Sequence, residues 1–565
     1  MLTYDKKSKS KNKDNPLVIL LIISSWLLGA IFFHVPWEPY EPFVFAIVKG
    51  IISNHSWLVP YISNVPYLEI QPFYFWIHAS IVKLFNIHDK VAIANTIRIT
   101  NGCLILSVII LVGKIGSKLS AYKNGRNCIL LLIASIGFIN NAYQLSPNII
   151  ILLGFCCYIY ALQLYNDLPG ISGGILFIGL LFMSINFTCE FLVIAILNLL
   201  ILPILDSSWR NKNYLATTMI GIILFSIIFL LYIYDLKSVN NEFFLQWVSK
   251  YTAIIADFSY KNFLAKILSI TIFLSWYILP SWFLIAWTIY KRYSTLLHDK
   301  VLQVSILLSI LLLSFSLFVN DNNIEGELFP ILIPAVLLAS VEIDSIRITI
   351  ISLFNWFSLF ITSFAATILW MLYFIINFDI LRKFFNTIHL PIIEFMLQFS
   401  QNYHYKFNIW NLSLAVLFTI IWILLITRKH IRGREVITNW ASGVTYILVL
   451  FLSLWLPWFN SILSFEYIVN DSIKYLDVKQ TSCIATNEAH SLQIALWYYY
   501  ADINLIPGFS NLDYNICDVA VISNQNSNES ILQNPKWHIV WQGHRPIDQK
   551  FYYILKRKSI VNNNS

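Results

Sequence analysis

Long runs of apolar residues dominate the chain, and short polar segments separate them. A run of about 18 apolar residues or more is long enough for a helix to cross the bilayer core of about 30 Å. We therefore predict an all-α polytopic membrane domain over residues 16–457, with about thirteen membrane-spanning helices. The predicted helices cover residues 16–36, 94–113, 127–142, 147–165, 171–187, 189–205, 214–234, 263–290, 301–318, 328–341, 347–377, 410–427 and 436–457. The pair 171–187 and 189–205 is separated by almost nothing and is also compatible with one broken helix.

The composition agrees with a membrane protein. Of the 565 residues, 58% are hydrophobic and only 12% are charged, whereas soluble domains carry about 25% charged residues. The net charge of +8 at pH 7 comes mostly from Lys and Arg in the loops. These charges indicate membrane orientation and give no reason to expect a nucleic-acid partner.

Loop charges predict the orientation because cytoplasmic loops are enriched in Lys and Arg. Residues 1–15 form a basic tail, which we place in the cytoplasm. The next basic cluster, from Lys114 to Arg126, is also cytoplasmic if residues 72–88 do not cross the membrane. Residues 37–88 then form a first outer loop whose aromatic, amphipathic stretches suit interfacial helices. We expect a multi-pass protein of the plasma (inner) membrane with an extracytoplasmic C-terminal end.

The last part of the chain, residues 458–565, has a different pattern. The stretch EAHSLQIALWYYYADI at 488–503 is typical of a helix. Four short stretches have the period-two pattern of β-strands, namely TSCIATNE, CDVAVISN, WHIVWQGH and FYYILKRK. We predict a small α/β domain outside the cytoplasm. Because Cys483 and Cys517 both begin predicted strands in an oxidising compartment, we also predict a disulfide between them.

Charged residues are rare inside the predicted spans, with Glu190 the main exception. Ion-coupled transporters usually carry carboxylates or Arg at mid-depth, so the pattern disfavours a transporter. Acidic residues gather in the outer loops instead. Two of them, Glu41 and Glu69, lie in aromatic, Pro-rich surroundings where desolvation would raise a carboxyl pKa. A raised pKa suits a general acid or base, so both are candidate catalytic residues.

Short motifs follow one another in the outer loops: WEPYE at 37–41, SWLVP at 56–60, YLEIQP at 67–72 and, later, GELFPILIP at 326–334. Their order and spacing resemble those of the lipid-dependent glycosyltransferases with the GT-C fold. The motifs resemble in particular those of the bacterial 4-amino-4-deoxy-L-arabinose lipid A transferases and the protein O-mannosyltransferases. The resemblance implies a GT-C-like membrane domain with an outer C-terminal domain, and transfer of a sugar from a polyprenyl-phosphate donor.

Several positions depart from the family pattern. The aspartate of the family's first loop falls on Tyr40, and a second aspartate, before a proline in the next outer loop, falls on Ser146. The lysine expected to meet a lipid phosphate falls on Ile70, and the lysine of the late motif falls on Glu327. The resemblance thus implies an intact scaffold with a reduced set of catalytic residues.

The chemistry of such a site needs a cation to hold the phosphate and a carboxylate to take a proton from the incoming hydroxyl. Glu41 is the better base candidate because it opens a predicted helix. Lys49, Lys250 and Lys261 are candidate phosphate-binding residues, and an interfacial snorkelling lysine is the alternative for each. In the arabinose transferases, the glutamate that corresponds to Glu69 helps bind a metal together with a downstream histidine. The stretch FFLQWVSKYT, where that histidine is sought, contains none.

We therefore expect a membrane glycosyltransferase that modifies an envelope glycolipid, glycan or protein, as in lipid A modification. Its expected partners are the lipid-linked sugar donor, the acceptor and membrane lipids, and a divalent metal is a possible cofactor. The first alternative is a catalytically inactive relative that binds lipid-linked sugar or partners an active enzyme. The second alternative is a lipid or polysaccharide transporter.

Overall fold

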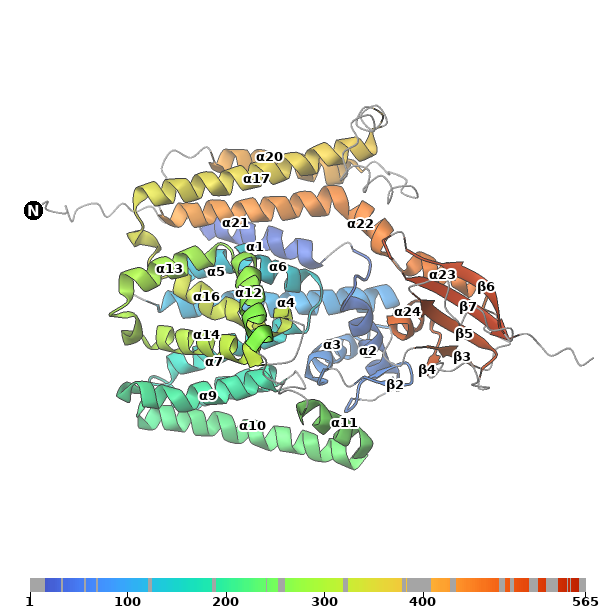
Figure 1. Ribbon diagram of the computed structural model, residues 1–565, viewed down its shortest axis with the longest axis horizontal. Helices are drawn as coiled ribbons and strands as arrows, with labels where there is room; N and C mark the ends of the chain where they lie inside the picture. Colours follow the sequence, from blue (N-terminus) through green and yellow to red (C-terminus); the bar gives the residue numbers. More distant parts are fainter. Residues whose placement is uncertain are drawn as a thin grey trace, which may run out of the picture.

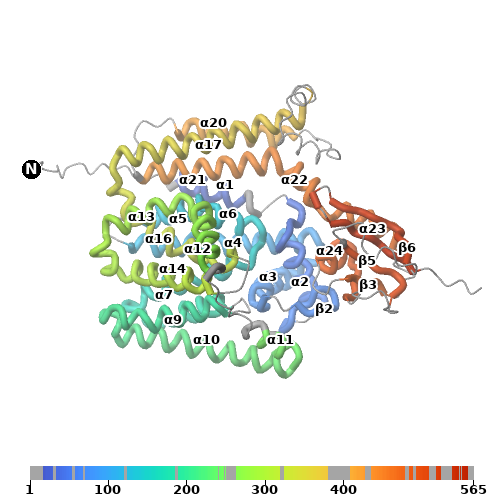
Figure 2. The backbone as a smooth tube through the Cα atoms, viewed as in Figure 1, coloured from blue at the N-terminus to red at the C-terminus, as the bar shows by residue number. Residues whose placement is uncertain are grey.

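The computed structural model consists of a bundle of helices with a small β-sheet beyond one end of the bundle (Figure 1). Figure 2 shows the same arrangement as a tube through the backbone. The structure describes residues 16–31, 34–54, 57–67, 70–119, 124–184, 189–239, 241–252, 260–318, 324–378, 383, 408–426, 433–476, 483–487, 492–507, 517–524, 537–545, 547–548 and 550–557.

The bundle contains apolar helices, most of which run along a common direction (Figure 1). They are α1 (Pro16–Ile31), α4 (Lys90–Ser117), α5 (Gly125–Ala134), α6 (Ile136–Tyr143), α7 (Asn148–Leu164), α8 (Pro169–Met183), α9 (Glu190–Leu205), α10 (Lys212–Val239), α12 (Tyr260–Tyr277), α13 (Ser281–Arg292), α14 (Lys300–Phe318), α16 (Leu332–Ala339), α17 (Ile348–Asn377), α20 (Ile409–Ile426) and α21 (Gly433–Leu450). Shorter helical elements join them: α11 (Asn241–Thr252), α15 (Ile324–Leu328), α22 (Leu456–Leu463), the 3-10 turns η1 (Ser207–Trp209), η2 (Leu296–His298), η3 (Phe329–Ile331) and η4 (Ile343–Ser345), and the π-helical turn η5 (Phe451–Trp455).

Each predicted span contains at least one helix. By length and composition, six of the described helices could cross a membrane, or up to eight if each of two bent pairs counts as one span. Shorter apolar helices accompany them, at Leu17–Leu28, Asn148–Leu164, Pro169–Met183 and Glu190–Leu205. The fold is therefore that of a multi-pass helical membrane protein, and the finer count of spans stays a prediction. α8 and α9 are two helical segments, and residues 185–188 between them lie outside the described residues, so the alternative of one broken helix stays open.

Two predicted spans are sharply bent. The stretch 127–142 consists of α5 and α6, which meet at 68° because the backbone of Ser135 between them is extended. The stretch 263–290 consists of α12 and α13, which meet at 103°. Pro280 stands directly before α13. Since proline has no N–H to donate and its ring clashes with the preceding turn, a helix cannot continue through it undisturbed.

Glycines let α7, α8 and α10 approach closely. A Cβ atom added to Gly179 of α8 would lie 3.0 Å from the carbonyl oxygen of Gly154 of α7, and the reverse holds for Gly154. Gly173 and Gly221 lie against side chains at the contact between α8 and α10 in the same way. Membrane helices often associate through small residues, because lipid offers no hydrophobic driving force and close van der Waals contact replaces it.

The first outer loop lies between the bundle and the C-terminal sheet (Figure 1). It contains α2 (Glu41–Asn54), the short antiparallel pair β1 (Tyr61–Ile62) and β2 (Val65–Pro66), and α3 (Phe73–Leu84). α3 has 12 residues, about 18 Å of helix, which is shorter than a membrane span requires. The expected helices within 37–88 are thus present.

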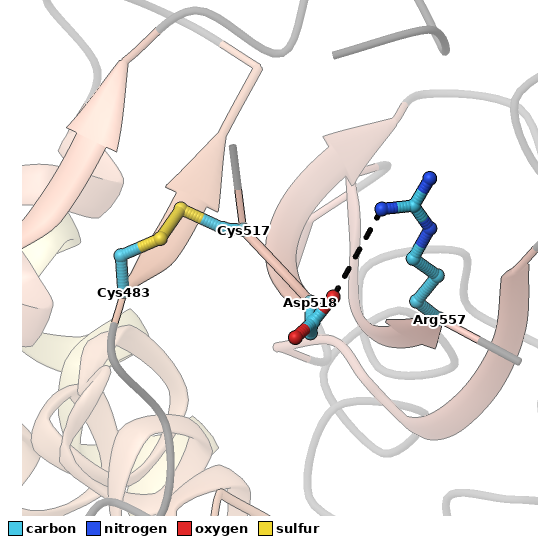
Figure 3. The surroundings of a disulfide bond; sticks show 4 residues. All are labelled: Cys483, Cys517, Asp518 and Arg557. Atoms are coloured by element: carbon cyan, nitrogen blue, oxygen red, sulfur yellow. Dashed lines mark ion pairs between the residues drawn. A yellow bond between two sulfur atoms is a disulfide. The ribbon is translucent and has the colours of Figure 1, made fainter. Parts of the chain in front are cut away.

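The C-terminal part forms a mixed sheet in the order β4-β3-β5-β7-β6. Its elements are α23 (Glu466–Ile473), β3 (Ile484–Thr486), α24 (Leu492–Ala501), β4 (Leu505–Pro507), β5 (Val519–Asn524), β6 (Trp537–Gly543) and β7 (Phe551–Arg557). β3 and β4 are parallel because α24 forms the crossover between them. Figure 3 shows the disulfide that joins Cys483 to Cys517 and, beside it, the ion pair of Asp518 and Arg557 at 4.0 Å.

Candidate active site

Glu41 opens α2, and its side chain is fully buried, with 0% of its surface exposed. The backbone N–H of Trp37 donates to Oε2 of Glu41 at 3.0 Å, and Nη2 of Arg98 donates to the same oxygen at 3.2 Å. Nδ1 of His34 lies 3.4 Å from this oxygen. Arg98 belongs to α4, and its guanidinium lies over the ring of Phe45 of α2 at 5.3 Å. These contacts tie the start of the outer loop and α2 to a long helix of the bundle.

The electrostatics of Glu41 differ from the expectation. Burial acts to raise the pKa of this carboxyl, but His34 and Arg98 together outweigh burial, so the pKa of Glu41 is lowered. The raised pKa expected for Glu41 from the sequence is therefore wrong, because His34 and Arg98 lie beside the carboxyl and favour its charged form. A carboxylate with a lowered pKa and no exposed surface is a poor proton acceptor and a strong anchor for Arg98.

α3 and the segment before it add buried polar groups, of which Tyr74 lies close enough to Glu41 to feel its charge. The hydroxyl of Tyr74 donates to the carbonyl oxygen of Leu145 at 3.1 Å, and the ring of His78 lies 4.6 Å from that of Tyr74. His78 and Gln71 are fully buried, and within the described part of the chain their side-chain nitrogen and oxygen atoms have no hydrogen-bond partner. Burial lowers the pKa of His78 to about 3, so its imidazole is neutral at physiological pH.

A second polar cluster gathers around Glu325 of α15. Nδ2 of Asn140 and Nδ2 of Asn141, both on α6, donate to Oε1 of Glu325 at 2.6 Å and 2.8 Å. Asn141 also donates to the hydroxyl of Tyr277 at 3.2 Å and accepts from Nδ2 of Asn148 at 3.1 Å. Asn141 is buried, whereas Glu325, Asn140 and Asn148 are half-buried. Like Glu41, Glu325 is held by hydrogen bonds, but its side chain is partly exposed whereas that of Glu41 is fully buried.

Tyr40 lies beside the second cluster. Burial raises the pKa of the Tyr40 hydroxyl, the negative charge of Glu325 raises it further, and a hydrogen bond with Ser146 opposes both. Tyr40 therefore stays a neutral hydroxyl close to a carboxylate. Tyr40 and Ser146 are the two positions at which the resemblance expects aspartates, and the structure brings both of them together near Glu325.

The arrangement of helices, outer loop and C-terminal sheet matches solved structures. ArnT from Cupriavidus metallidurans, bound to undecaprenyl phosphate, superposes with a TM-score of 0.67 at 13% identity, over 96% of this chain and 98% of that chain. The chain has the GT-C fold. The apo state of the same ArnT gives a TM-score of 0.65 at 13% identity, over 95% of this chain and 97% of that chain.

The apo oligosaccharyltransferase of Archaeoglobus fulgidus gives a TM-score of 0.39 at 11% identity, over 89% of this chain and 65% of that chain. No protein-family model matches the sequence, and no curated protein matches it significantly. At an identity of 13% the likeness to ArnT establishes the GT-C fold, and the chemistry has to be argued from the side chains.

Within the GT-C fold, the predicted site residues do not all come together. Lys49 of α2 donates to the carbonyl oxygen of Tyr498 at 2.8 Å and forms an ion pair with Asp502. Lys49 is therefore engaged in the contact with the C-terminal sheet domain and is not part of the Glu41 cluster. Lys250 falls in α11 and Lys261 in α12, but their side chains lie outside what the structure describes.

The candidate metal ligand Glu69 also lies outside the described residues. Among the residues that are described, no group of three or more His, Cys, Asp or Glu side chains could hold a metal ion. The divalent metal at Glu69 therefore stays a prediction from the resemblance.

Sequence reasoning missed Arg98 and Glu325. Arg98 stands in the predicted span 94–113, and an arginine within an apolar run is costly enough to indicate a functional contact. That signal was present in the sequence. Glu325 and its partner Asn141 are 184 positions apart, and no local pattern connects them.

Proposed function

We propose that this GT-C protein is a membrane glycosyltransferase that transfers a sugar from a polyprenyl-phosphate donor. The acceptor is an envelope glycolipid, glycan or protein on the extracytoplasmic side of the plasma (inner) membrane. The observation that carries the proposal is the likeness to ArnT over 96% of this chain, because that ArnT structure holds undecaprenyl phosphate. The order of motifs in the first outer loop supports the same conclusion.

In the proposed reaction an acceptor hydroxyl attacks the anomeric carbon of the sugar. The bond from that carbon to the phosphate oxygen breaks, and the polyprenyl phosphate leaves with the electron pair. Because the donor already carries a good leaving group, the protein has to hold the phosphate, orient the acceptor and take one proton. Much of the rate can come from positioning alone.

The described contacts give Glu41 a positioning role in this proposal. Its bonds to Trp37 and Arg98 fix the turn that precedes α2, and Tyr40 lies in that turn. Lys250 and Lys261 remain the candidate phosphate ligands, since Lys49 is held by Asp502. Glu69 remains a candidate for the donor or metal site.

A catalytically inactive relative that binds lipid-linked sugar is the second candidate. Two observations favour it: Tyr40 and Ser146 replace the expected aspartates, and Glu41 has no exposed surface with which to touch a substrate. Such a protein would bind the polyprenyl phosphate without consuming the linked sugar.

Gene disruption distinguishes the two candidates. Envelope glycolipids, glycans and proteins of the disrupted strain are compared by mass spectrometry with those of the same strain complemented by the wild-type gene. A glycosyltransferase predicts that one acceptor class loses the mass of a sugar in the disrupted strain and regains it on complementation. If lipid-linked sugars and all acceptors have the same masses in both strains, the proposal of a glycosyltransferase is wrong.

A further inference from the structure

Among the described residues, Glu325 combines three features that neither Glu41 nor Glu327 shares. It is half-buried, its Oε1 atom is fixed by two amide donors, and its charge acts on Tyr40. Glu41 is ion-paired and has 0% exposure, and Glu327, two positions further along, is only 5% exposed. Among the residues that the structure describes, no lysine or arginine is ion-paired with Glu325.

We propose that Glu325 is the catalytic base of the transfer, an inference that rests on the proposed glycosyltransferase function. As the hydroxyl oxygen of the acceptor bonds to the anomeric carbon, its proton moves to the Glu325 carboxylate. The carbon–oxygen bond to the phosphate breaks, and the polyprenyl phosphate takes the electron pair. Glu325 then releases the proton to water. No other reactant is needed for this balance.

The hydrogen bonds of Glu325 orient the carboxylate for this role. All of the hydrogen bonds described for it end on Oε1, so Oε2 is the oxygen left for the acceptor. Asn141 is itself fixed by Tyr277 and Asn148. A base whose supporting residues are locked in this way can be held in the geometry that proton transfer requires.

Residues near Glu325 explain why a carboxylate from α15 is needed as the base. The resemblance expects aspartates at positions 40 and 146, and this chain has a tyrosine and a serine there. Their hydroxyls are neutral, so neither can accept the acceptor's proton at neutral pH. Glu325 supplies the missing negative charge at the same place from a different element. The hydroxyl of Tyr40 can then donate a hydrogen bond to an oxygen of the bound donor or acceptor.

Glu325→Gln is the sharpest variant, because glutamine keeps an oxygen that accepts from Asn140 and Asn141 and loses only the proton-accepting charge. Glu325→Asp keeps the charge but shortens the side chain. Asp235→Asn is the matched control, since Asp235 is an exposed carboxylate on another helix, α10. Membranes with equal amounts of each full-length variant are mixed with the lipid extract of the disrupted strain, which contains the unused donor, and with its envelope material, which supplies the acceptor. The initial rate of sugar transfer is followed by mass spectrometry.

The same variants, purified in detergent, are tested for thermal stabilisation by undecaprenyl phosphate. The proposal predicts that Glu325→Gln slows transfer by about 10²-fold or more with unchanged stabilisation by undecaprenyl phosphate. Glu325→Asp should retain part of the rate and Asp235→Asn all of it.

A Glu325→Gln rate within a few-fold of wild type would overturn the assignment. Loss of stabilisation by undecaprenyl phosphate in Glu325→Gln would overturn it as well, in favour of a donor-binding role. If the wild type transfers no sugar, the proposed glycosyltransferase function is wrong, and the assignment of Glu325 as its base is wrong too.

Discussion

Glu41 and Arg98 form a buried ion pair in which each side chain neutralises the charge of the other. Arg98 has 7% and Glu41 0% of its side-chain surface exposed, so neither charge can be solvated by water if the other is removed. Replacing both members of a buried pair is often tolerated, whereas removing one leaves an uncompensated charge. The pair therefore makes α2 and α4 depend on each other.

Arg98→Met should lower the free energy of unfolding by about 3–5 kcal/mol, because it leaves the Glu41 carboxylate buried without its cation. The double variant Glu41→Gln, Arg98→Met should recover a large part of that loss. Thermal unfolding of the detergent-purified variants, arranged as a double-mutant cycle, measures the coupling. If the two single losses simply add, the ion pair is not a coupled unit.

The lowered pKa of Glu41 also predicts a pH dependence. A carboxyl whose folded pKa lies below its unfolded value adds stability above the unfolded pKa of about 4.3 and loses it as the pH falls further. The stability difference between wild type and Glu41→Gln should therefore shrink as the pH falls below about pH 4. Melting temperatures measured at falling pH test it, and a difference that stays constant to pH 3 would contradict the assigned shift.

Among the elements, the apolar runs predicted where the helices lie but not where they bend. The apolar runs continue through Ser135 and Pro280, so the number of apolar residues does not reveal the 68° bend between α5 and α6 or the 103° bend between α12 and α13. In the C-terminal domain the sequence patterns predicted α24 and the strands β3, β5, β6 and β7 but not β4, although β3 and β4 have three residues each. The Glu41 motif was visible in the sequence, but Arg98 and Glu325 meet their partners only through tertiary packing.

The close contact of α7 and α8 gives a prediction for a single glycine. Gly179→Leu should destabilise the protein by about 1–3 kcal/mol or more, because its Cβ would lie against the backbone of Gly154, which cannot move aside. Gly174→Leu on the same helix is the control, since nothing lies within 4 Å of its added Cβ. Thermal aggregation in detergent should separate the two variants. Equal midpoints of thermal aggregation for Gly179→Leu and Gly174→Leu would mean that Gly154 and Gly179 do not determine the distance between α7 and α8.

Across the whole molecule, several polar contacts join the C-terminal domain to the first outer loop. Asp502 pairs with Lys49 of α2 and with Lys90, 2.5 Å away at the start of α4. Arg545, 5% exposed, donates to Glu38 at 2.8 Å and lies 3.6 Å over the ring of Phe465. The ring of Tyr499 on α24 also stacks against Phe45 of α2 at 5.4 Å. The domain thus holds the same loop that carries Tyr40 and Glu41.

Asp502→Lys should loosen this contact, because it places a third positive charge beside Lys49 and Lys90. We expect faster cleavage of the C-terminal domain by a protease added to membranes. Asp518→Lys is the matched control: Asp518 is 82% exposed and pairs with Arg557 at 4.0 Å inside the domain, and exposed pairs contribute little. Equal cleavage rates for Asp502→Lys and wild type would show that the ion pairs do not hold the domain.

The predicted orientation places the N-terminus and residue 120 in the cytoplasm and the C-terminus outside. A reporter that is active only outside the cytoplasm should be inactive when fused near residue 120 and active when fused after residue 565. Activity near residue 120 would mean that residues 72–88 cross the membrane and that the predicted span count is wrong.

The most direct test of the central claim follows donor and acceptor in one reaction. Membranes containing the wild-type protein are added to the lipid extract and envelope material of the disrupted strain, and mass spectrometry follows both. If the protein is a glycosyltransferase of this kind, a polyprenyl-phosphate sugar disappears, polyprenyl phosphate appears, and the acceptor gains the mass of that sugar. If the lipid-linked sugar persists and no acceptor changes mass, the protein is not a glycosyltransferase of this kind.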